Sequence, residues 1–493
     1  MNIFRPSSKN ASNVNKPSSI LSSCLPETLW EIEKRLSQPT FRGVPVGSAL
    51  ASLLYLELYC RNGDWSIKGA LKNRMRFFYH HLYIRKGGET DVSFCKGRVL
   101  VTGIEPNFRC RDLVFPVAER LGYDRCVLLY IEPEMTGLLP QGAMGLDVEQ
   151  SACYDIWSWR RDYLRFWIAF KPVVKQTVRE LDLPWGVYYR LADAVVSCTQ
   201  RIAGFLEFLR RSQVAAVLTE YDRNWMWAPL VLSAKALGIP TYTLMHGVTS
   251  EKCLGFYPLL ADTIFCWGEM FANIFVAAGV DPSRIEVAGC PRLTRDLPMP
   301  PDKARAKMGL DPNKPVVMLA TSNYHWDNRL KLAETFCQAV HGSPAFTGVV
   351  RLHPMDKLQG YAELAARFPS VMFMSNEEFS LDVALAASDI IVVHSSGFGS
   401  DALAKRRLTV VLDTIDQSLE HSLELIKLAG SPRATSSESL SDIVHQLLFN
   451  EQERCKHRQL AEEYVRKFCA FFGDEAARRI ANHVLSKIDN ISK

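Results

Sequence analysis

Short apolar runs, each bounded by Gly, Pro or Asp, recur along this chain and limit the folds that it can adopt. From residue 96 onward the runs GRVLVTG, CVLLYIEP, AAVLTE, TYTLMHG, DTIFCWG and RIEVAG follow one another, with helical stretches between several of them. Continuous apolar runs of this length are typical of parallel strands buried on both faces of a sheet. The alternation of such strands with helices predicts an open parallel sheet.

A second series of the same kind begins after residue 315. VVMLATS, GVVRLHP, VMFMS, DIIVVHSS and LTVVLD predict five more buried strands, again with helices between them. Residues 291–315 separate the two series, and their six prolines and lack of a long apolar run indicate a linker. The predicted fold class is therefore α/β, with two Rossmann-like domains whose parallel sheets face a central cleft.

The length of 493 residues and the 47% hydrophobic content suit two cores better than one. Residues 1–24 are rich in Ser, Asn, Lys and Pro and are predicted to be disordered. The other predicted boundaries are an N-terminal Rossmann-like domain with helical insertions at 25–290, a linker at 291–315, a C-terminal Rossmann-like domain at 316–450 and C-terminal helices at 451–493.

Charge and cysteine usage exclude several function classes. A net charge of +5 is too small for a dedicated nucleic-acid binder, although it suits an anionic ligand or an acidic membrane surface. The 13 cysteines include no Cys-x-x-Cys pair, so neither a disulfide framework nor a zinc cluster is indicated. With no apolar N-terminal segment and no spanning helix expected, the predicted location is cytoplasmic.

In open parallel sheets, ligands bind beyond the carboxyl ends of the strands, so the residues after each apolar run are the candidate site. In the first domain Glu220 and Asp222 follow AAVLT, and His246 follows TYTLM. A carboxylate there could deprotonate a sugar hydroxyl, and His246 is the rival base. The alternative for the two acids is a helix cap, since acidic residues are common just before helices.

In the second domain the run GVVRL ends with Arg351 and Leu352, and His353 and Pro354 follow it. Pro354 favours an extended His353, whose imidazole could hydrogen-bond or protonate a leaving phosphate. A lone histidine at a strand end is more often structural than catalytic. Thr321 and Ser322 follow the first strand of this domain. They could line a pocket for the donor of this phosphate, or they could form an ordinary turn.

The strand DIIVV ends in Ser395, Ser396 and Gly397, just before a predicted helix that contains Asp401. Hydroxyls and free backbone N–H groups at this position suit a nucleotide phosphate, while Asp401 could accept hydrogen bonds from a ribose. The alternative is an ordinary helix cap with a glycine turn, in which Asp401 only favours the helix dipole.

The order of these motifs resembles the GT-B glycosyltransferase superfamily over roughly residues 97–450. LGIPTYTLMHGV, ADTIFCWGEMFANIFVAAGVDPSRIEVAGCPR, RLHP and SDIIVVHSSGFGSDALAKRRLTVVLD carry the resemblance. Together they resemble bacterial capsule and lipopolysaccharide enzymes: sialyltransferases and Kdo transferases that use CMP-sugars, and CDP-glycerol glycerophosphotransferases.

The resemblance implies a transferase that moves a sugar, for example a CMP-activated acidic sugar, to a surface glycan or glycolipid without a metal or other cofactor. It assigns His353 and Pro354, with Ser395 and Ser396, to the donor, and it supports His246 as well. The sialyltransferase group has an acidic motif ending in glycine, whereas here Arg223 follows Asp222. The alternatives are an isomerase of the UDP-sugar 2-epimerase kind and a catalytically silent glycan-assembly protein on the same fold.

Aromatic and basic residues interleave between residues 157 and 175. One interpretation is a peripheral membrane contact, in which the aromatic rings enter the interface of an acidic bilayer and the cations contact its headgroups. The other is that the aromatics pack into the N-terminal domain and the charges form its solvated face. The aromatics in question are Trp157, Trp159, Phe166 and Trp167, and the cations are Arg160, Arg161, Arg165, Lys171 and Lys175.

Overall fold

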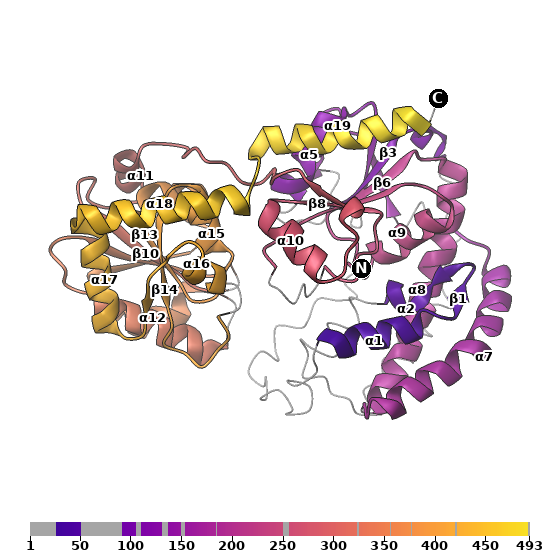
Figure 1. Ribbon diagram of the computed structural model, residues 1–493, viewed down its shortest axis with the longest axis horizontal. Helices are drawn as coiled ribbons and strands as arrows, with labels where there is room; N and C mark the ends of the chain where they lie inside the picture. The colour runs from indigo at the N-terminus through magenta and orange to yellow at the C-terminus, as the bar shows by residue number, and fades with distance from the viewer. Residues whose placement is uncertain are drawn as a thin grey trace.

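The computed structural model describes residues 26–50, 91–104, 110–130, 137–148, 153–183, 185–249, 256–322, 325–354, 356–375, 377–419 and 422–491. In these residues the chain forms two α/β units, each built around one parallel sheet (Figure 1). The prediction of two open parallel sheets with flanking helices is confirmed. The predicted disordered segment 1–24 lies outside the described residues.

The first sheet has the strand order β5-β4-β3-β6-β7-β8-β9, with every neighbouring pair parallel. Because the chain order reverses between β3 and β6, the ends of these two strands form the topological switch point, where open α/β sheets bind ligands. The strands are β3 (Val99–Ile104), β4 (Cys126–Tyr130), β5 (Gly145–Asp147), β6 (Ala216–Thr219), β7 (Thr241–Leu244), β8 (Thr263–Cys266) and β9 (Ile285–Val287).

The second sheet has the order β12-β11-β10-β13-β14-β15, also parallel throughout. Its switch point lies between β10 and β13. The sequence did not predict β15, or β5 in the first sheet, because runs of two or three residues give no periodic signal. The strands are β10 (Val316–Ala320), β11 (Thr347–Arg351), β12 (Val371–Met374), β13 (Ile390–Val393), β14 (Leu408–Leu412) and β15 (Arg433–Ala434).

Helices cover both sheets, as the buried strands require. Those of the first unit are α1 (Pro26–Leu36), α2 (Val46–Ala49), α5 (Phe115–Leu121), α7 (Ile156–Glu180), α8 (Trp185–Ser212), α9 (Trp227–Ala236) and α10 (Glu269–Ala277). Those that follow are α11 (Pro301–Lys307), α12 (Trp326–Val340), α13 (Ala362–Arg367), α14 (Leu381–Ala387), α15 (Phe398–Ala404), α16 (Leu423–Lys427), α17 (Ser437–Phe449), α18 (Glu451–Phe468) and α19 (Gly473–Ile491). A small hairpin pairs β1 (Thr40–Phe41) with β2 (Val44–Pro45).

Helix α7 separates the aromatic residues of the 157–175 stretch into two sets. Trp159 and Phe166 are buried at 7% and 6% exposure, in one cluster with Phe170 of the same helix, so the expectation that they enter a membrane interface is wrong. Trp157, at 71% exposure, points to solvent. Among the described residues, no helix combines the length and the apolar character needed to span a membrane.

The C-terminal helices join the two units. Helix α18 packs on α15 and α17 of the second unit, whereas α19 returns to the first unit and lies along α5 (Figure 1). Ala477, Ile480 and Val484 of α19 are buried in the core of the first unit. Gly289, with φ +87°, permits the close approach of this segment, because a Cβ there would lie 2.1 Å from the carbonyl oxygen of Phe471.

Candidate functional site

Glu220 lies at the switch point of the first sheet, immediately after β6. Its side chain is buried, at 1% exposure. The backbone N–H of the next residue, Tyr221, donates to the hydroxyl of Thr219 at 3.2 Å, which forms a tight turn at the strand end. This turn holds Glu220 at the place where an open α/β sheet binds its ligand.

Asp222, two residues later, turns toward the protein interior. Its Oδ2 accepts hydrogen bonds from the backbone N–H groups of Leu260 and Ala261, both at 2.8 Å. Burial raises the pKa of Asp222, although these hydrogen bonds and the Arg223 charge oppose the rise. The arrangement gives Asp222 a structural task, which is to hold the loop before β8.

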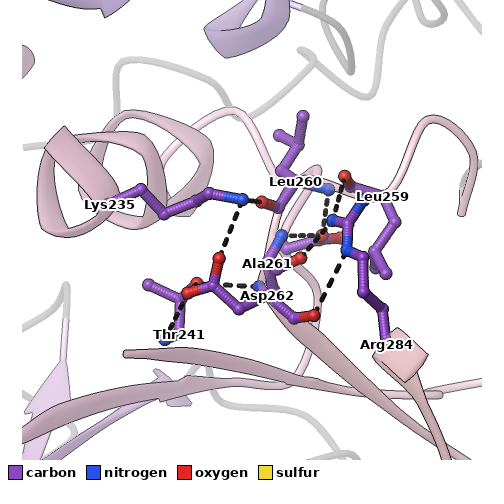
Figure 2. Close-up of polar contacts among 8 residues, drawn as sticks. Lys235, Thr241, Leu259, Leu260, Ala261, Asp262 and Arg284 are labelled. Carbon is purple, nitrogen blue, oxygen red and sulfur yellow. Dashed lines mark hydrogen bonds and ion pairs between the residues drawn. The ribbon is translucent and has the colours of Figure 1, made fainter. Parts of the chain in front are cut away.

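The loop that Asp222 holds is fixed from several sides (Figure 2). Arg284 donates to the carbonyl oxygens of Leu259 at 2.9 Å and of Asp262 at 3.2 Å. Lys235 donates to the carbonyl of Leu260 at 2.8 Å and pairs with the Asp262 carboxylate at 3.0 Å. Residues 259–262 are thus a rigid support for the strand-end residues.

Arg223 and Glu33 form a buried ion pair that no sequence pattern indicated. Arg223 Nη2 donates to Glu33 Oε2 at 2.8 Å, and the two side chains are only 7% and 5% exposed. Arg223 also donates to the carbonyl of Pro258 at 2.8 Å. The pair ties helix α1 to the loop that carries Glu220.

His246 follows β7, the neighbour of β6, and is partly buried. Its ring stacks on Phe256 with 4.7 Å between the ring centres, and it lies 4.4 Å from the ring of Tyr221. The structure therefore brings the two rival bases, Glu220 and His246, to the ends of adjacent strands. The ring of Tyr221, the residue after Glu220, lies against the imidazole of His246.

In the second unit, Thr321 and His353 meet at the ends of β10 and β11. The hydroxyl of Thr321 accepts a hydrogen bond from the backbone N–H of His353 at 2.8 Å, and Thr321 N–H donates to the Arg351 carbonyl at 3.1 Å. Ser322 is partly exposed beside Thr321, and Pro354 is exposed after His353. Four of the predicted donor residues thus share one edge of the sheet.

The His353 side chain is partly buried beside an ion pair. Burial lowers the pKa of His353, and so does the charge of Arg329, whereas Asp356 raises it. Asp356 pairs with Arg329 and accepts a hydrogen bond from the Tyr361 hydroxyl at 2.9 Å. The net effect lowers the pKa of His353, which favours the neutral imidazole, and that form carries one N–H donor.

Arg351 lies at the end of β11 with its guanidinium buried. Its Nη1 donates to the carbonyl of Phe379 at 3.0 Å, and burial lowers its pKa to about 10. This contact directs the guanidinium toward the turn before α14. The Arg351 side chain therefore contacts the backbone of its own unit, whereas the sequence placed it among the candidates for binding the donor.

The turn formed by Ser395, Ser396 and Gly397 follows β13, on the other side of β10 from His353. Ser395 is buried, and Ser396 and Gly397 are partly exposed. Ser396 Oγ accepts a hydrogen bond from the Phe398 N–H at 3.3 Å. The turn therefore stands at the switch point of the second sheet, opposite Thr321.

Asp401, expected near a ribose, is engaged by Arg292 from the segment that joins the two sheets. Both carboxylate oxygens accept from the guanidinium, at 2.7 and 3.1 Å. No sequence signal indicated this pairing, because the two residues are 109 positions apart.

The loop that follows His246 in the first unit lies close to the turn after β13 in the second unit. A Cβ placed on Gly397 would lie 3.0 Å from Val248 Cγ2, and Val248 is two residues after His246. The strand-end loop of the first sheet thus touches the strand-end turn of the second. Three predicted residues are engaged elsewhere: Asp222 holds residues 260 and 261, Arg351 holds residue 379, and Asp401 pairs with Arg292.

No protein-family model matches the chain, and no curated protein matches its sequence. Among solved structures, the wall teichoic acid polymerase TagF with CDPG is 12% identical over 87% of this chain and 100% of its own, with a TM-score of 0.51. A Listeria monocytogenes protein described as a UDP-N-acetylglucosamine 2-epimerase is 14% identical over 80% of this chain and 97% of its own, also at 0.51. HepE from Anabaena, in complex with UDP-glucose, is 13% identical over 79% and 99%, at 0.48.

At these identities the likeness to TagF and to the Listeria protein concerns the fold. It agrees with the two parallel sheets and their flanking helices, and the chain has the two-unit GT-B architecture. Because one fold hosts several activities, function has to be argued from the site.

Proposed function

We propose that this chain is a glycosyltransferase that moves a sugar from a nucleotide donor to a surface glycan or glycolipid. The observation that supports the proposal is the close approach of Gly397 and Val248, because Gly397 belongs to the turn after β13 and Val248 follows His246. A transferase needs such a meeting of an acceptor-activating group with a donor-binding turn. We assign the donor to the second unit and the acceptor to the first.

The leaving nucleotide phosphate would be stabilised by His353 and by the turn at Ser395 and Ser396. A neutral imidazole has one N–H to donate to a phosphate oxygen, and the lowered pKa of His353 favours that form at pH 7. The hydroxyls of the turn would add further donors.

For the base we favour Glu220, with His246 as the rival and Asp222 as the weakest candidate. Glu220 stands at the switch point, whereas the Oδ2 atom of Asp222 already accepts hydrogen bonds from two backbone N–H groups. A carboxylate that deprotonates the acceptor hydroxyl for direct attack on the anomeric carbon would invert its configuration. The bond to the acceptor oxygen forms as the bond to the phosphate oxygen breaks.

The donor that we propose is a CMP-activated acidic sugar, on the resemblance of RLHP and of the Ser395-Ser396 pair to capsule and lipopolysaccharide transferases. Incubation with CMP-, CDP-, UDP- and GDP-sugars, with and without glycan acceptors, tests both the donor and the reaction class. We expect nucleotide release that depends on an acceptor. Conversion of the donor sugar without an acceptor would indicate an isomerase, and binding without turnover a silent glycan-assembly protein.

We propose that transfer is independent of metal ions, because His353 and the turn would neutralise the leaving phosphate themselves. Turnover in EDTA measures this directly, and we expect it to persist. Complete loss that magnesium or manganese restores would contradict the proposal.

We further propose that the protein works at the cytoplasmic face of a membrane, where a lipid-linked acceptor would lie. The outer face of α7 carries Trp157, Leu164 and Ile168 at 71%, 60% and 74% exposure, together with exposed Arg160, Arg161 and Arg165. Such a face suits an anionic bilayer.

Flotation with liposomes tests this proposal. We expect binding to acidic but not to neutral vesicles, weakened by salt and by the joint change of Arg160, Arg161 and Arg165 to Glu. Protein that stays at the bottom of the gradient with every lipid would refute docking through α7.

A further inference from the structure

Arg292 and Asp401 form a largely buried ion pair at the junction of the two units. Arg292 lies in the segment that joins the sheets, and Asp401 lies in α15 of the second unit. The two guanidinium nitrogens Nη1 and Nη2 donate to the two carboxylate oxygens, and the side chains are 17% and 9% exposed. A two-point pair of this kind fixes an angle as well as a distance.

On the other side, Arg292 lies over the indole of Trp267, with 5.3 Å from its Cζ to the ring centre. Trp267 is buried at 1% exposure, and its Nε1 donates to the carbonyl oxygen of Met245 at 2.7 Å. Met245 immediately precedes His246. Arg292 is therefore connected to the His246 loop through one rigid ring.

Asp401 is connected just as closely to the donor turn. Helix α15 starts directly after Gly397, and its Ser400 hydroxyl is 2.8 Å from the hydroxyl of Tyr464 in α18. Thr409 of β14 also donates to the carbonyl of Gly399 at 3.3 Å. With α15 held in this way, a displacement of Asp401 would displace the turn that precedes the helix.

The two connected loops approach each other at Gly397 and Val248, where a Cβ on the glycine would lie only 3.0 Å from Val248 Cγ2. A movement of Asp401 relative to Trp267 would open or close this contact. The ion pair and the indole on one side, and the loop contact on the other, therefore connect the donor turn to the His246 loop by two routes.

We propose that Arg292, Asp401 and Trp267 form a clamp that sets the spacing between the donor turn and His246 during transfer. The proposal rests on the proposed function, since it assigns the turn to the donor and the His246 loop to the acceptor side. Arg292 and Asp401 act here as positioning residues.

The test is Arg292→Lys, which keeps the charge but cannot form the two-point pair. A misplacement of about 1 Å can cost about 100-fold in rate, so we expect kcat to fall by about that factor. Nucleotide affinity by calorimetry and Tm should stay close to wild type. A merely structural role would lower Tm and kcat together.

The matched control is Arg295→Lys. Arg295 pairs with Glu462 of α18 at 2.6 Å and lies 5.5 Å from the Phe472 ring, so it makes the same two kinds of contact. Arg295 contacts neither Asp401 nor Trp267 in these two interactions, and we expect normal kcat. Equal kcat in the Arg292 and Arg295 variants would overturn the clamp. A fall in nucleotide affinity that matches the fall in kcat would overturn it too, because Arg292 would then serve the donor site alone.

A second variant and a second measurement keep the test independent of folding and of the proposed function. Asp401→Asn retains the size of the side chain and should reproduce the loss of kcat if Arg292→Lys fails to fold. Hydrogen exchange should rise at both 247–249 and 395–400 in either variant and remain unchanged in Arg295→Lys. If hydrogen exchange at 247–249 is unchanged in the Arg292 and Asp401 variants, the clamp is refuted, whether or not the wild-type protein transfers a sugar. If exchange rises in these variants but the wild-type protein transfers no sugar, only the proposed function is refuted.

Discussion

Asp222 and Glu220 lie two residues apart, yet we predict opposite outcomes when each is changed. Asp222→Ala removes the acceptor of two backbone N–H groups, those of Leu260 and Ala261. A buried donor left without a partner costs about 1–3 kcal/mol, so the two together should lower the free energy of unfolding by about 2–6 kcal/mol. In a domain of this size, 1 kcal/mol corresponds to about 2–4 °C, and Tm should fall by at least about 4 °C.

Asp222→Asn is the matched variant, because its amide oxygen can still accept both hydrogen bonds. It should recover most of the stability, and its kcat should stay near wild type. Glu220→Gln should behave in the opposite way, with nearly unchanged Tm and a loss of about 10²–10⁴-fold in kcat. Thermal unfolding and donor turnover, measured on the same four proteins including the wild type, separate the two roles.

One result would refute this reasoning. If Asp222→Asn kept its Tm but lost transfer, while Glu220→Gln remained active, Asp222 would be the base and its hydrogen bonds to residues 260 and 261 would be secondary. Loss of transfer in His246→Ala, with an active Glu220→Gln, would instead assign the base to the histidine.

Three further predictions concern the donor side. His353→Ala should lower kcat about 100-fold or more in a folded protein, because the leaving phosphate loses a donor, and near-normal turnover would contradict this. Ser395→Ala and Ser396→Ala should each weaken nucleotide binding about tenfold while acceptor binding hardly changes, and unchanged affinity by calorimetry would move the donor site elsewhere. Arg329→Met removes a charge that lowers the pKa of His353 and leaves Asp356, which raises it, without its ion-pair partner. The pKa of His353 should therefore rise, and the acid limb of the pH profile of kcat should move to higher pH. An acid limb that does not move would exclude His353 as its source.

The sequence predicted the strands and the strand-end residues because both depend on local signals. A run such as AAVL is buried on both faces, and the residue that follows it has to lie at an edge of the sheet. Glu220, His246 and Ser395 could therefore be selected without a structure. The residues that lie next to them on adjacent strands could not be selected in this way, because the strand order depends on packing between segments that are distant in the sequence.

Side-chain partners were predicted less well. Asp222 and Asp401 both match a local rule, the acidic residue near a helix start, yet their partners lie 38 and 109 positions away. No local pattern distinguishes a carboxylate that contacts a ligand from one that contacts a distant backbone or guanidinium. The aromatic stretch of α7 differs, because helical spacing does group Trp159, Phe166 and Phe170 on one face and Trp157 on another. That signal was available in the sequence.

The strand order groups the candidates of each sheet around one reversal point. Because β3 lies beside β6, and β10 beside β13, each sheet has a single reversal point, at Glu220 in the first and at Thr321 and Ser395 in the second. His246 and His353 stand one strand away from these reversal points, after the ends of β7 and β11. A ligand that bridges both crevices would reach an acid and an imidazole from one unit and an imidazole and a turn of hydroxyls from the other. A sugar donor and its acceptor need that division, which is why the contact between Gly397 and Val248 supports transfer more strongly than any one of these residues does by itself.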